Sequence, residues 1–433
     1  MHKLRIALLG NVNNNFYLLA KILNDTNEYD ATIFVNTSEP YINQPESDDP
    51  SISNAYPHWI KSIKTPTIRL MRILPRLSAL KRSINDFDLC ILSGDFICLA
   101  PYLRIPVIFY PTGVDLTRMP FPQLDEEPYR FMSPKWMARQ LFSLNLKKGI
   151  KKSTLITSIY FERFENALRK LSIVEGDLRL AKTYLPWVID PAKIKKIKPD
   201  MLSKSALDLR STSDFIVFSP SRLIDVNNYS RSETGAWKNN SLLVKGFAEF
   251  VSLLNNNLRS VPKLVFLENA NSPDIDRIKA LVTSLGIKSN VIWLKNANGF
   301  GYTRDELLEL YSSVDVVADD FGAGWFGGVA LEGLCCELPV LNHTAEGLMS
   351  KLYGSNPFLE ANTSTGAAKH LMDLFAKPEY RFELGGAGRE WIEKNHGSDS
   401  ILIAIRNVTG EALRIAMDTP DKVDLFNGFC DKN

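Results

Sequence analysis

The chain has 433 residues, 45% of them hydrophobic, and a formal net charge of +2. Its length exceeds one ordinary hydrophobic core, so two domains are expected. The near-neutral charge does not suggest a nucleic-acid partner, and no apolar run of about eighteen residues is present to span a membrane. The five cysteines lack zinc-type or redox-motif spacing, and the apolar N-terminal run is too short for a signal peptide. These features favour a protein of the reducing cytosol.

The first residues indicate a parallel, doubly wound sheet. An apolar strand over 4–9 ends at Gly10, a polar turn follows, and residues 16–23 form a predicted helix before a second strand at 31–35. The turn is not GxGxxG, so the dinucleotide fingerprint is absent. Gly10 either makes a tight turn or lies in a loop that faces a cleft between domains, where the carboxyl ends of such strands bind ligands.

Two aspartates follow buried strands further along the first half. Apolar runs at 87–92 and 107–110 are strands, and they lead directly into loops that carry Asp95 and Asp115. Because loops at strand ends line ligand sites, both carboxylates are candidates for polar contacts with a substrate. Capping of a helix N-terminus is the alternative interpretation.

Two segments combine basic and apolar residues. They span 61–82, which contains no Asp or Glu, and 135–152. One interpretation is a pair of amphipathic helices with solvated basic faces. The other is contact with an anionic membrane surface or with a phosphate-bearing acceptor.

A lysine-rich segment separates two β-α series. We predict an N-terminal α/β domain over 1–195, a linker over 196–213 and a C-terminal α/β domain over 214–397. A further helix is expected over 398–417, and 418–433 form a tail. Both domains are expected to be Rossmann-like α/β layers that face a central cleft.

The most informative stretch lies at 314–342. It predicts a strand, a glycine-rich loop, a helix that carries Glu332, and a second strand after Pro339. Backbone N–H groups at the start of such a helix bind anions. Arg222 follows the first strand of this half and Lys238 precedes its first helix. Two cations and a helix N-terminus suit a pyrophosphate, and a carboxylate one turn further on suits ribose hydroxyls.

These motifs resemble glycosyltransferase family 4, whose members are retaining enzymes of the GT-B fold. The resemblance is most specific at 327–340, where Glu332 precedes Cys335, Cys336 and Pro339. The pair Arg222 and Lys238 is similar to the family's basic pair. Matches at 111–115, 186–190 and 383–391 extend the resemblance over nearly the whole chain, and it is specific in the C-terminal half and loose in the N-terminal half. The resemblance implies that the domain over 1–195 binds the acceptor and that the domain over 214–397 binds the nucleotide sugar. It also implies that the helix over 398–417 packs back on the first domain.

The resemblance implies roles for individual residues. The catalytic candidates are Arg222, Lys238 and Asp115, and the donor-binding candidates are Gly10, Asp320, Gly324, Gly327, Gly328 and Glu332. Two positions depart from the family pattern. Gly324 stands where the family's first glutamate helps to hold the donor sugar, and Glu337 stands where a glycine is usual. Asp319 or Asp320 is the candidate replacement for the missing glutamate.

The expected activity is transfer of a sugar, with retention of configuration, from a nucleoside-diphosphate sugar to a glycan or lipid-linked acceptor. The context would be cell-surface polysaccharide or glycoconjugate synthesis, in the cytoplasm and at the inner membrane surface. No cofactor or metal is expected, because cationic side chains take the metal's role. A catalytically degenerate protein that binds a nucleotide sugar or a partner, and a nucleotide-sugar epimerase, are the alternatives.

Overall fold

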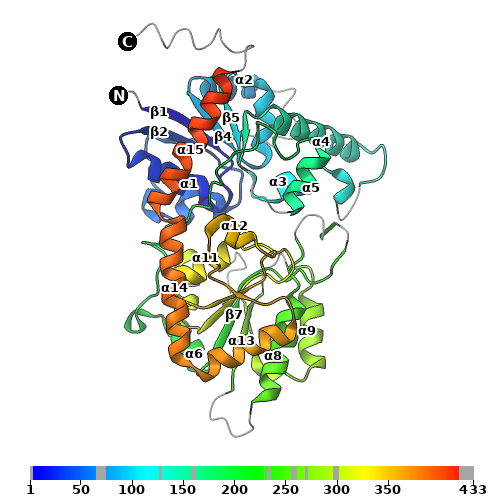
Figure 1. Cartoon of the computed structure of the whole chain (residues 1–433), viewed down its shortest axis with the longest axis vertical. Helices are drawn as coiled ribbons and strands as arrows, with labels where there is room; N and C mark the ends of the chain where they lie inside the picture. The colour runs from blue at the N-terminus through cyan, green and yellow to red at the C-terminus, as the bar shows by residue number, and fades with distance from the viewer. Residues whose placement is uncertain are drawn as a thin grey trace. The chain divides into compact units, whose positions relative to one another are not determined.

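The computed structural model describes residues 3–64, 75–125, 129–157, 162–228, 230–231, 236–254, 261–268, 272–295 and 302–418. The chain divides into two compact units (Figure 1). The first unit combines Met1–Ile189 with Ser398–Asn433, and the second is Asp190–Gly397. None of the described helices is long and apolar enough to cross a membrane.

The first unit contains a six-stranded parallel sheet with the strand order β3-β2-β1-β4-β5-β6. Its strands are β1 (Leu4–Leu9), β2 (Tyr29–Asn36), β3 (Ile60–Ile63), β4 (Leu89–Leu92), β5 (Val107–Phe109) and β6 (Leu155–Ile156). The central strand β1 pairs with β2 on one side and β4 on the other, with Ile6 opposite Ala31 and Leu89. The strand order therefore reverses between β1 and β4.

Helices cover this sheet. They are α1 (Asn15–Asn24), α2 (Pro75–Asn85), α3 (Val114–Thr117), α4 (Pro134–Lys152), α5 (Glu162–Lys170) and α15 (Ser398–Met417). Short 3-10 turns are η1 (Val12–Asn14), η2 (Tyr41–Asn43), η3 (Pro45–Ser47), η4 (Pro50–Ile52), η6 (Gly94–Tyr102) and η7 (Pro122–Leu124). Ile401, Ile405 and Val408 of α15 are fully buried in the same core as Phe16 of α1 and Ile6 of β1. The last described helix is thus part of the first unit's core.

The second unit repeats the plan with the order β12-β11-β10-β7-β8-β9. Its strands are β7 (Ile216–Ser219), β8 (Lys263–Leu267), β9 (Val291–Leu294), β10 (Val316–Ala318), β11 (Val340–Asn342) and β12 (Leu359–Glu360). All the pairings are parallel, and β7 lies between β8 and β10. Here the strand order reverses between β7 and β10.

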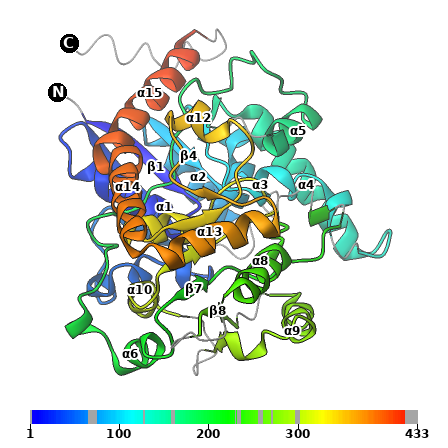
Figure 2. The ribbon, with the colours of Figure 1, turned by 60° about the horizontal axis from the view of Figure 1, so that its bottom comes forward.

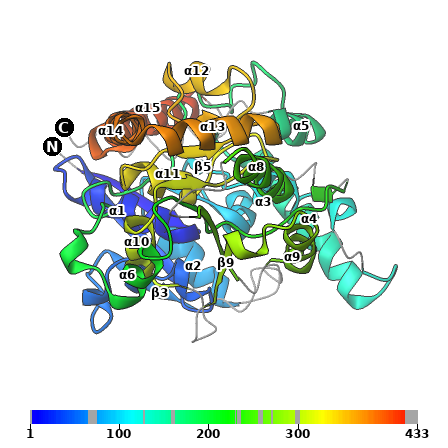
Figure 3. The ribbon, with the colours of Figure 1, turned by 90° about the horizontal axis from the view of Figure 1, so that it is seen from below.

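The helices of the second unit are α6 (Lys204–Arg210), α8 (Asn240–Leu253), α9 (Ile275–Ser284), α10 (Arg304–Ser312), α11 (Gly328–Cys335), α12 (Leu348–Tyr353), α13 (Ser364–Ala376) and α14 (Pro378–His396). Its 3-10 turns are η8 (Pro199–Met201) and η9 (Lys288–Asn290). Helices α8 and α13 lie side by side in Figures 2 and 3. They approach so closely that a Cβ at Gly246 of α8 would lie 2.6 Å from the carbonyl oxygen of Ser364. Phe247 and Leu371 belong to the core at this contact.

The predicted fold class, two doubly wound α/β units, is confirmed by the two parallel sheets. Two local expectations differ from the structure. The basic segment at 61–82 does not begin as a helix, because Ile60–Ile63 is the edge strand β3; residues 65–74 lie outside the described part. Helix α6 lies within the segment predicted as a linker, and the Ser203 hydroxyl caps it by accepting the N–H of Ala206.

Candidate functional site

The point where a parallel sheet reverses its strand order is a natural binding site. The connections from neighbouring strands leave in opposite directions there, which opens a crevice at the carboxyl ends. In the second unit this point lies after β7 and β10. Residues 220–222 follow β7 directly, and Asp319 and Asp320 follow β10. The sequence-predicted site therefore falls on the switch point of this unit.

A buried ion pair forms the centre of this site. The ammonium of Lys238 lies 2.6 Å from Oδ2 of Asp320 and 3.8 Å from Oδ1 of Asp319. Oδ1 of Asp320 accepts the N–H groups of Gly322 and Ala323 at 2.9 and 2.7 Å. One carboxylate thus fixes both the lysine and the start of the glycine-rich loop. The sequence alone presented Lys238 as a cation for a phosphate. In the structure its ammonium is already paired with a carboxylate.

Asp319 ties this pair to the start of α11. Its carboxylate accepts the Ser221 hydroxyl and the N–H of Gly327, the latter at 3.2 Å. Gly327 is the N-cap residue of α11. One of the amides expected to bind a phosphate is therefore already engaged by a side chain. The N–H groups of the first turn, from Gly328 onward, remain as the anion-binding end of the helix.

The charges in this cluster balance. Lys238 and Arg222 carry two positive charges, and the two aspartates carry two negative ones. Burial alone would lower the pKa of Lys238, but Asp320 and Asp319 raise it above its ordinary value, while nearby Arg222 opposes them. Burial raises the pKa of Asp320, although Lys238 works against that rise. Arg222 is exposed and makes no ion pair with any residue that the structure describes, so it is the cation most available to a ligand.

Glu332 lies in the second turn of α11 and is also held by partners. Its Oε1 pairs with the guanidinium of Arg304, and its Oε2 accepts the Tyr311 hydroxyl at 2.9 Å. Both partners come from α10. Each carboxylate oxygen has two lone pairs, so the two bonds orient the group and leave acceptor capacity for a ligand hydroxyl.

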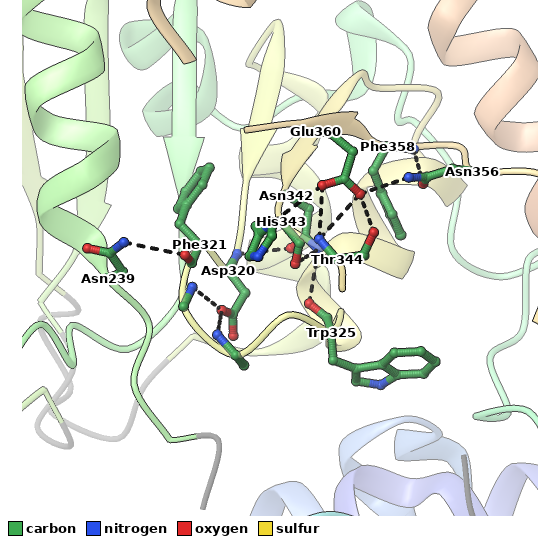
Figure 4. A network of polar contacts seen from close by, with 12 residues as sticks. Asn239, Asp320, Phe321, Trp325, Asn342, His343, Thr344, Asn356, Phe358 and Glu360 are labelled. Carbon is green, nitrogen blue, oxygen red and sulfur yellow. Dashed lines mark hydrogen bonds and ion pairs between the residues drawn. The ribbon is translucent and has the colours of Figure 1, made fainter. Parts of the chain in front are cut away.

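The glycine-rich loop is fixed from the neighbouring strand as well. The side chain of Asn342, fully buried at the end of β11, accepts the N–H of Asp320 at 3.0 Å and donates to the Trp325 carbonyl at 3.0 Å (Figure 4). The His343 N–H donates to the Asp320 carbonyl at 2.7 Å. Gly324 has a φ of +75°, a conformation that a glutamate there would adopt only with strain. A glycine at position 324 therefore suits the conformation of this loop.

The switch point of the first unit contains Gly10. Its φ is +103°, and a Cβ there would lie 2.4 Å from the carbonyl oxygen of Ser93, which follows β4. Close approach of two backbone segments therefore requires this glycine. Close packing of the two backbone segments accounts for the residue, and its donor-binding role remains a prediction.

Asp115 organises loops in the same unit. Its buried carboxylate accepts the N–H groups of Gly94, Thr112 and Gly113 at 2.9 to 3.0 Å. Burial raises the pKa of Asp115, and these N–H bonds offset part of the rise. The arrangement differs from an N-cap of α3, because Thr112 and Gly113 precede α3, Asp115 lies inside it and Gly94 begins η6. Its catalytic role remains a prediction.

We expect Asp115→Asn to destabilise the protein by about 1–3 kcal/mol, because the amide NH₂ would face backbone N–H donors. Urea unfolding measures this change. Asp86→Asn, at an exposed position of the same unit, is the matched control and should leave the unfolding midpoint in place. An Asp115→Asn protein as stable as the wild type would contradict the loop-organising role.

Known proteins resemble this chain in structure only. No family model and no curated protein matches it. Anabaena HepE in complex with UDP and glucose is 15% identical over 94% of this chain and 99% of that chain, with a TM-score of 0.62. A glycosyltransferase from Rickettsia africae is 13% identical over 95% and 99%, with a TM-score of 0.62. Sucrose-phosphate synthase from Thermosynechococcus elongatus is 15% identical over 95% and 100%, also at 0.62. The chain therefore has the fold of GT-B glycosyltransferases.

The structure brings several of the sequence-predicted residues together. Lys238, Asp320 and Gly327 belong to one hydrogen-bonded cluster, with Arg222 close enough to affect the lysine. Sequence reasoning missed Ser221, Asn342, Arg304 and Tyr311. The positions of Ser221 and Asn342, at the carboxyl ends of strands β7 and β11, were the signal that could have found them.

Proposed function

We propose that this protein is a retaining glycosyltransferase that takes its sugar from a nucleoside-diphosphate sugar without a metal ion. One observation carries the proposal. The switch point of the second unit combines Arg222, the Lys238–Asp320 pair and the first turn of α11, all at the carboxyl ends of β7 and β10. The same fold is found in HepE, whose structures contain UDP and UDP-glucose.

The difficult step is loss of the nucleoside diphosphate, because negative charge accumulates on the departing phosphate oxygen. Arg222 and the N–H groups of the first turn of α11 would stabilise that charge. Lys238 would add a positive charge whose position is fixed before the substrate binds. The bond from the anomeric carbon to phosphate breaks, and the acceptor hydroxyl attacks from the same face. Its proton leaves with the diphosphate.

Asp320 should give donor binding a pH dependence. A bound diphosphate adds two negative charges to a cluster whose own charges cancel. The added negative charge favours protonation of Asp320, because burial already raises the pKa of this carboxyl. We therefore expect UDP-glucose to bind more tightly as the pH falls toward the pKa that Asp320 has in the complex. Calorimetry in buffers of different ionisation enthalpy should show proton uptake. The phosphates of a nucleotide sugar do not titrate in this range, so proton release or no change would contradict the charge assignment.

The acceptor is proposed to be a glycan or a lipid-linked glycan in cell-surface polysaccharide synthesis, used in the cytoplasm at the inner membrane surface. The first unit, with loops at the switch point between β1 and β4, would bind it. Incubation with a panel of nucleotide sugars and lipid-linked glycans tests transfer directly. The expected result is a nucleoside diphosphate and a lengthened acceptor whose new linkage keeps the donor's anomeric configuration.

A degenerate protein that binds without catalysis is the second candidate, and two observations favour it. Gly324 replaces the family's first glutamate, and Lys238 is already paired with Asp320. Such a protein would show a rise in melting temperature with a nucleotide sugar but no diphosphate release with any acceptor. Release of diphosphate that depends on an acceptor excludes it.

A nucleotide-sugar epimerase is the third candidate. A proposed UDP-N-acetylglucosamine 2-epimerase from Listeria monocytogenes is 13% identical over 94% of this chain, with a TM-score of 0.50. Its reaction needs no acceptor, so incubation with the donor alone separates the two activities. We expect no epimerised sugar in that incubation.

A further inference from the structure

The outer face of α4 in the first unit carries an unusual concentration of exposed apolar side chains. Met137, Leu141 and Leu144 follow one another at helical spacing and are 49, 50 and 58% exposed. The turn before the helix adds Phe131 and Met132, which are 69 and 70% exposed. We call these five residues the apolar stripe. Figures 1 and 3 draw α4 and this turn, in cyan to green, at the edge of the first unit.

The opposite face of α4 is held firmly, so the stripe cannot turn inward. Phe142, Leu146 and Ile150 are buried in the unit. Gly149 allows the carbonyl of Ile97 in η6 to approach so closely that a Cβ would lie 2.1 Å from it. The Ser143 hydroxyl also donates to the Pro120 carbonyl at 2.6 Å. The exposure of the stripe therefore follows from the packing of the helix.

The turn is built to hold its side chains outward. Met132 has a φ of +58°, a conformation that costs energy for a non-glycine residue. The next residue, Ser133, caps α4 by accepting the N–H of Trp136 at 3.1 Å. The ring of Trp136 packs edge-on against Phe131, with their centroids 5.0 Å apart. The cap and the ring contact tie this turn to the first turn of the helix.

The second half of α4 is basic. Lys147, Lys148, Lys151 and Lys152 lie in its last two turns, and the helix contains no Asp or Glu. No ion pair connects these four lysines to any residue within the described ranges. Lys148 and Lys151 continue the line of Met137, Leu141 and Leu144 along the exposed face. One face of one helix thus changes from apolar to cationic along its length.

We propose that this face of α4 binds an anionic lipid bilayer: the apolar stripe enters the boundary between headgroups and acyl chains, and the four lysines contact anionic headgroups. Apolar side chains on an exposed face and lysines beside them are the two features that interfacial segments combine. The inference deepens the proposed function and rests on it only for the acceptor, because a lipid-linked acceptor is reached from the bilayer surface.

A soluble phosphate-bearing acceptor would account for the lysines and leave the apolar stripe without a role. A second copy of the chain would bring another set of the same four lysines into the interface and no Asp or Glu from α4, because a two-fold interface uses the same patch of both copies. A partner that is apolar inside and anionic at its surface matches both halves of the helix.

Flotation with phosphatidylcholine vesicles, with and without phosphatidylserine, tests the proposal on the full chain. We expect binding to the anionic vesicles that weakens as salt is added. Leu141→Ser with Leu144→Ser should weaken it roughly tenfold or more. Lys148→Gln with Lys151→Gln should weaken it by about fivefold for each lysine, on anionic vesicles only. Leu178→Ser and Lys195→Gln, at exposed positions elsewhere, are the matched controls.

The outcomes are distinct. All the substituted side chains are exposed, so the melting temperatures of the variants should equal that of the wild type. Measuring these temperatures does not require nucleotide binding. The proposal is overturned if the wild type does not float with anionic vesicles, or if the leucine variant floats as well as the wild type. It is also overturned if the wild type is a dimer in sedimentation analysis and the leucine substitutions dissociate that dimer without weakening vesicle binding. Because none of these readouts needs a donor, loss of the proposed glycosyltransferase activity would leave the result intact.

Discussion

Lys238→Ala is expected to reduce kcat/KM by about 10²–10³-fold, the effect of removing one preorganised group that stabilises developing charge. The same substitution leaves Asp320 buried without its cation, and breaking a buried pair in this way costs about 3–5 kcal/mol of stability. Steady-state kinetics and urea unfolding measure the two effects. Lys245→Ala, on the exposed face of α8, is the matched control and should change neither quantity.

A double variant separates catalysis from folding. In Lys238→Met with Asp320→Asn, both charges are gone, and the Asn oxygen can still accept the N–H groups of Gly322 and Ala323. We expect it to recover much of the lost stability, because replacing both partners avoids the unpaired buried charge. Its turnover should stay low. Recovery of activity together with stability would show that Lys238 serves the fold alone.

Glu332→Ala is expected to lower turnover strongly through donor binding. Its carboxylate is oriented by Arg304 and Tyr311 and is the proposed acceptor for the ribose hydroxyls, so its loss should weaken UDP binding by roughly tenfold or more, as loss of a charge-assisted bond does. Affinity for inorganic pyrophosphate, which has no ribose, should stay within about twofold. Calorimetry with both ligands measures the difference.

Two further variants control this result. Glu390→Ala, at an exposed position of α14, should leave both affinities unchanged. Arg222→Ala should weaken UDP and pyrophosphate alike, because we expect its guanidinium to contact the phosphates. If Glu332→Ala also weakens both ligands equally, the carboxylate acts on the phosphate end or through the fold, and the ribose assignment is wrong.

Most of the sheet framework was predictable from the sequence. Buried parallel strands are nearly continuous apolar runs, so 4–9 and 215–219 are visible without a structure. Edge strand β3 was missed because Lys61 and Ser62 interrupt it, and a strand at an edge buries less of its surface. Helix α6 was missed because it is short and lies in a lysine-rich segment, where its Ser203 cap was the main local signal.

The grouping of residues at the switch point of the second unit was predictable from the sequence, but their pairings were not. Residues at the carboxyl ends of strands converge whatever their order in the chain, which is why Arg222, Lys238 and Asp320 could be grouped. Asp320, the partner of Lys238, is far from it in the sequence. The two residues meet only when β7 and β10 lie side by side, and no periodicity of the sequence predicts that contact. The same is true of Arg304 and Glu332, whose helices α10 and α11 meet only in the folded unit.

The location of a bound diphosphate tests the central claim most directly. A crystal structure with UDP-glucose should show phosphate oxygens within hydrogen-bond distance of the Arg222 guanidinium and of N–H groups in the first turn of α11, with the ribose hydroxyls at Glu332. A diphosphate bound elsewhere in the chain, with Arg222 and α11 making no contact to it, would contradict the account.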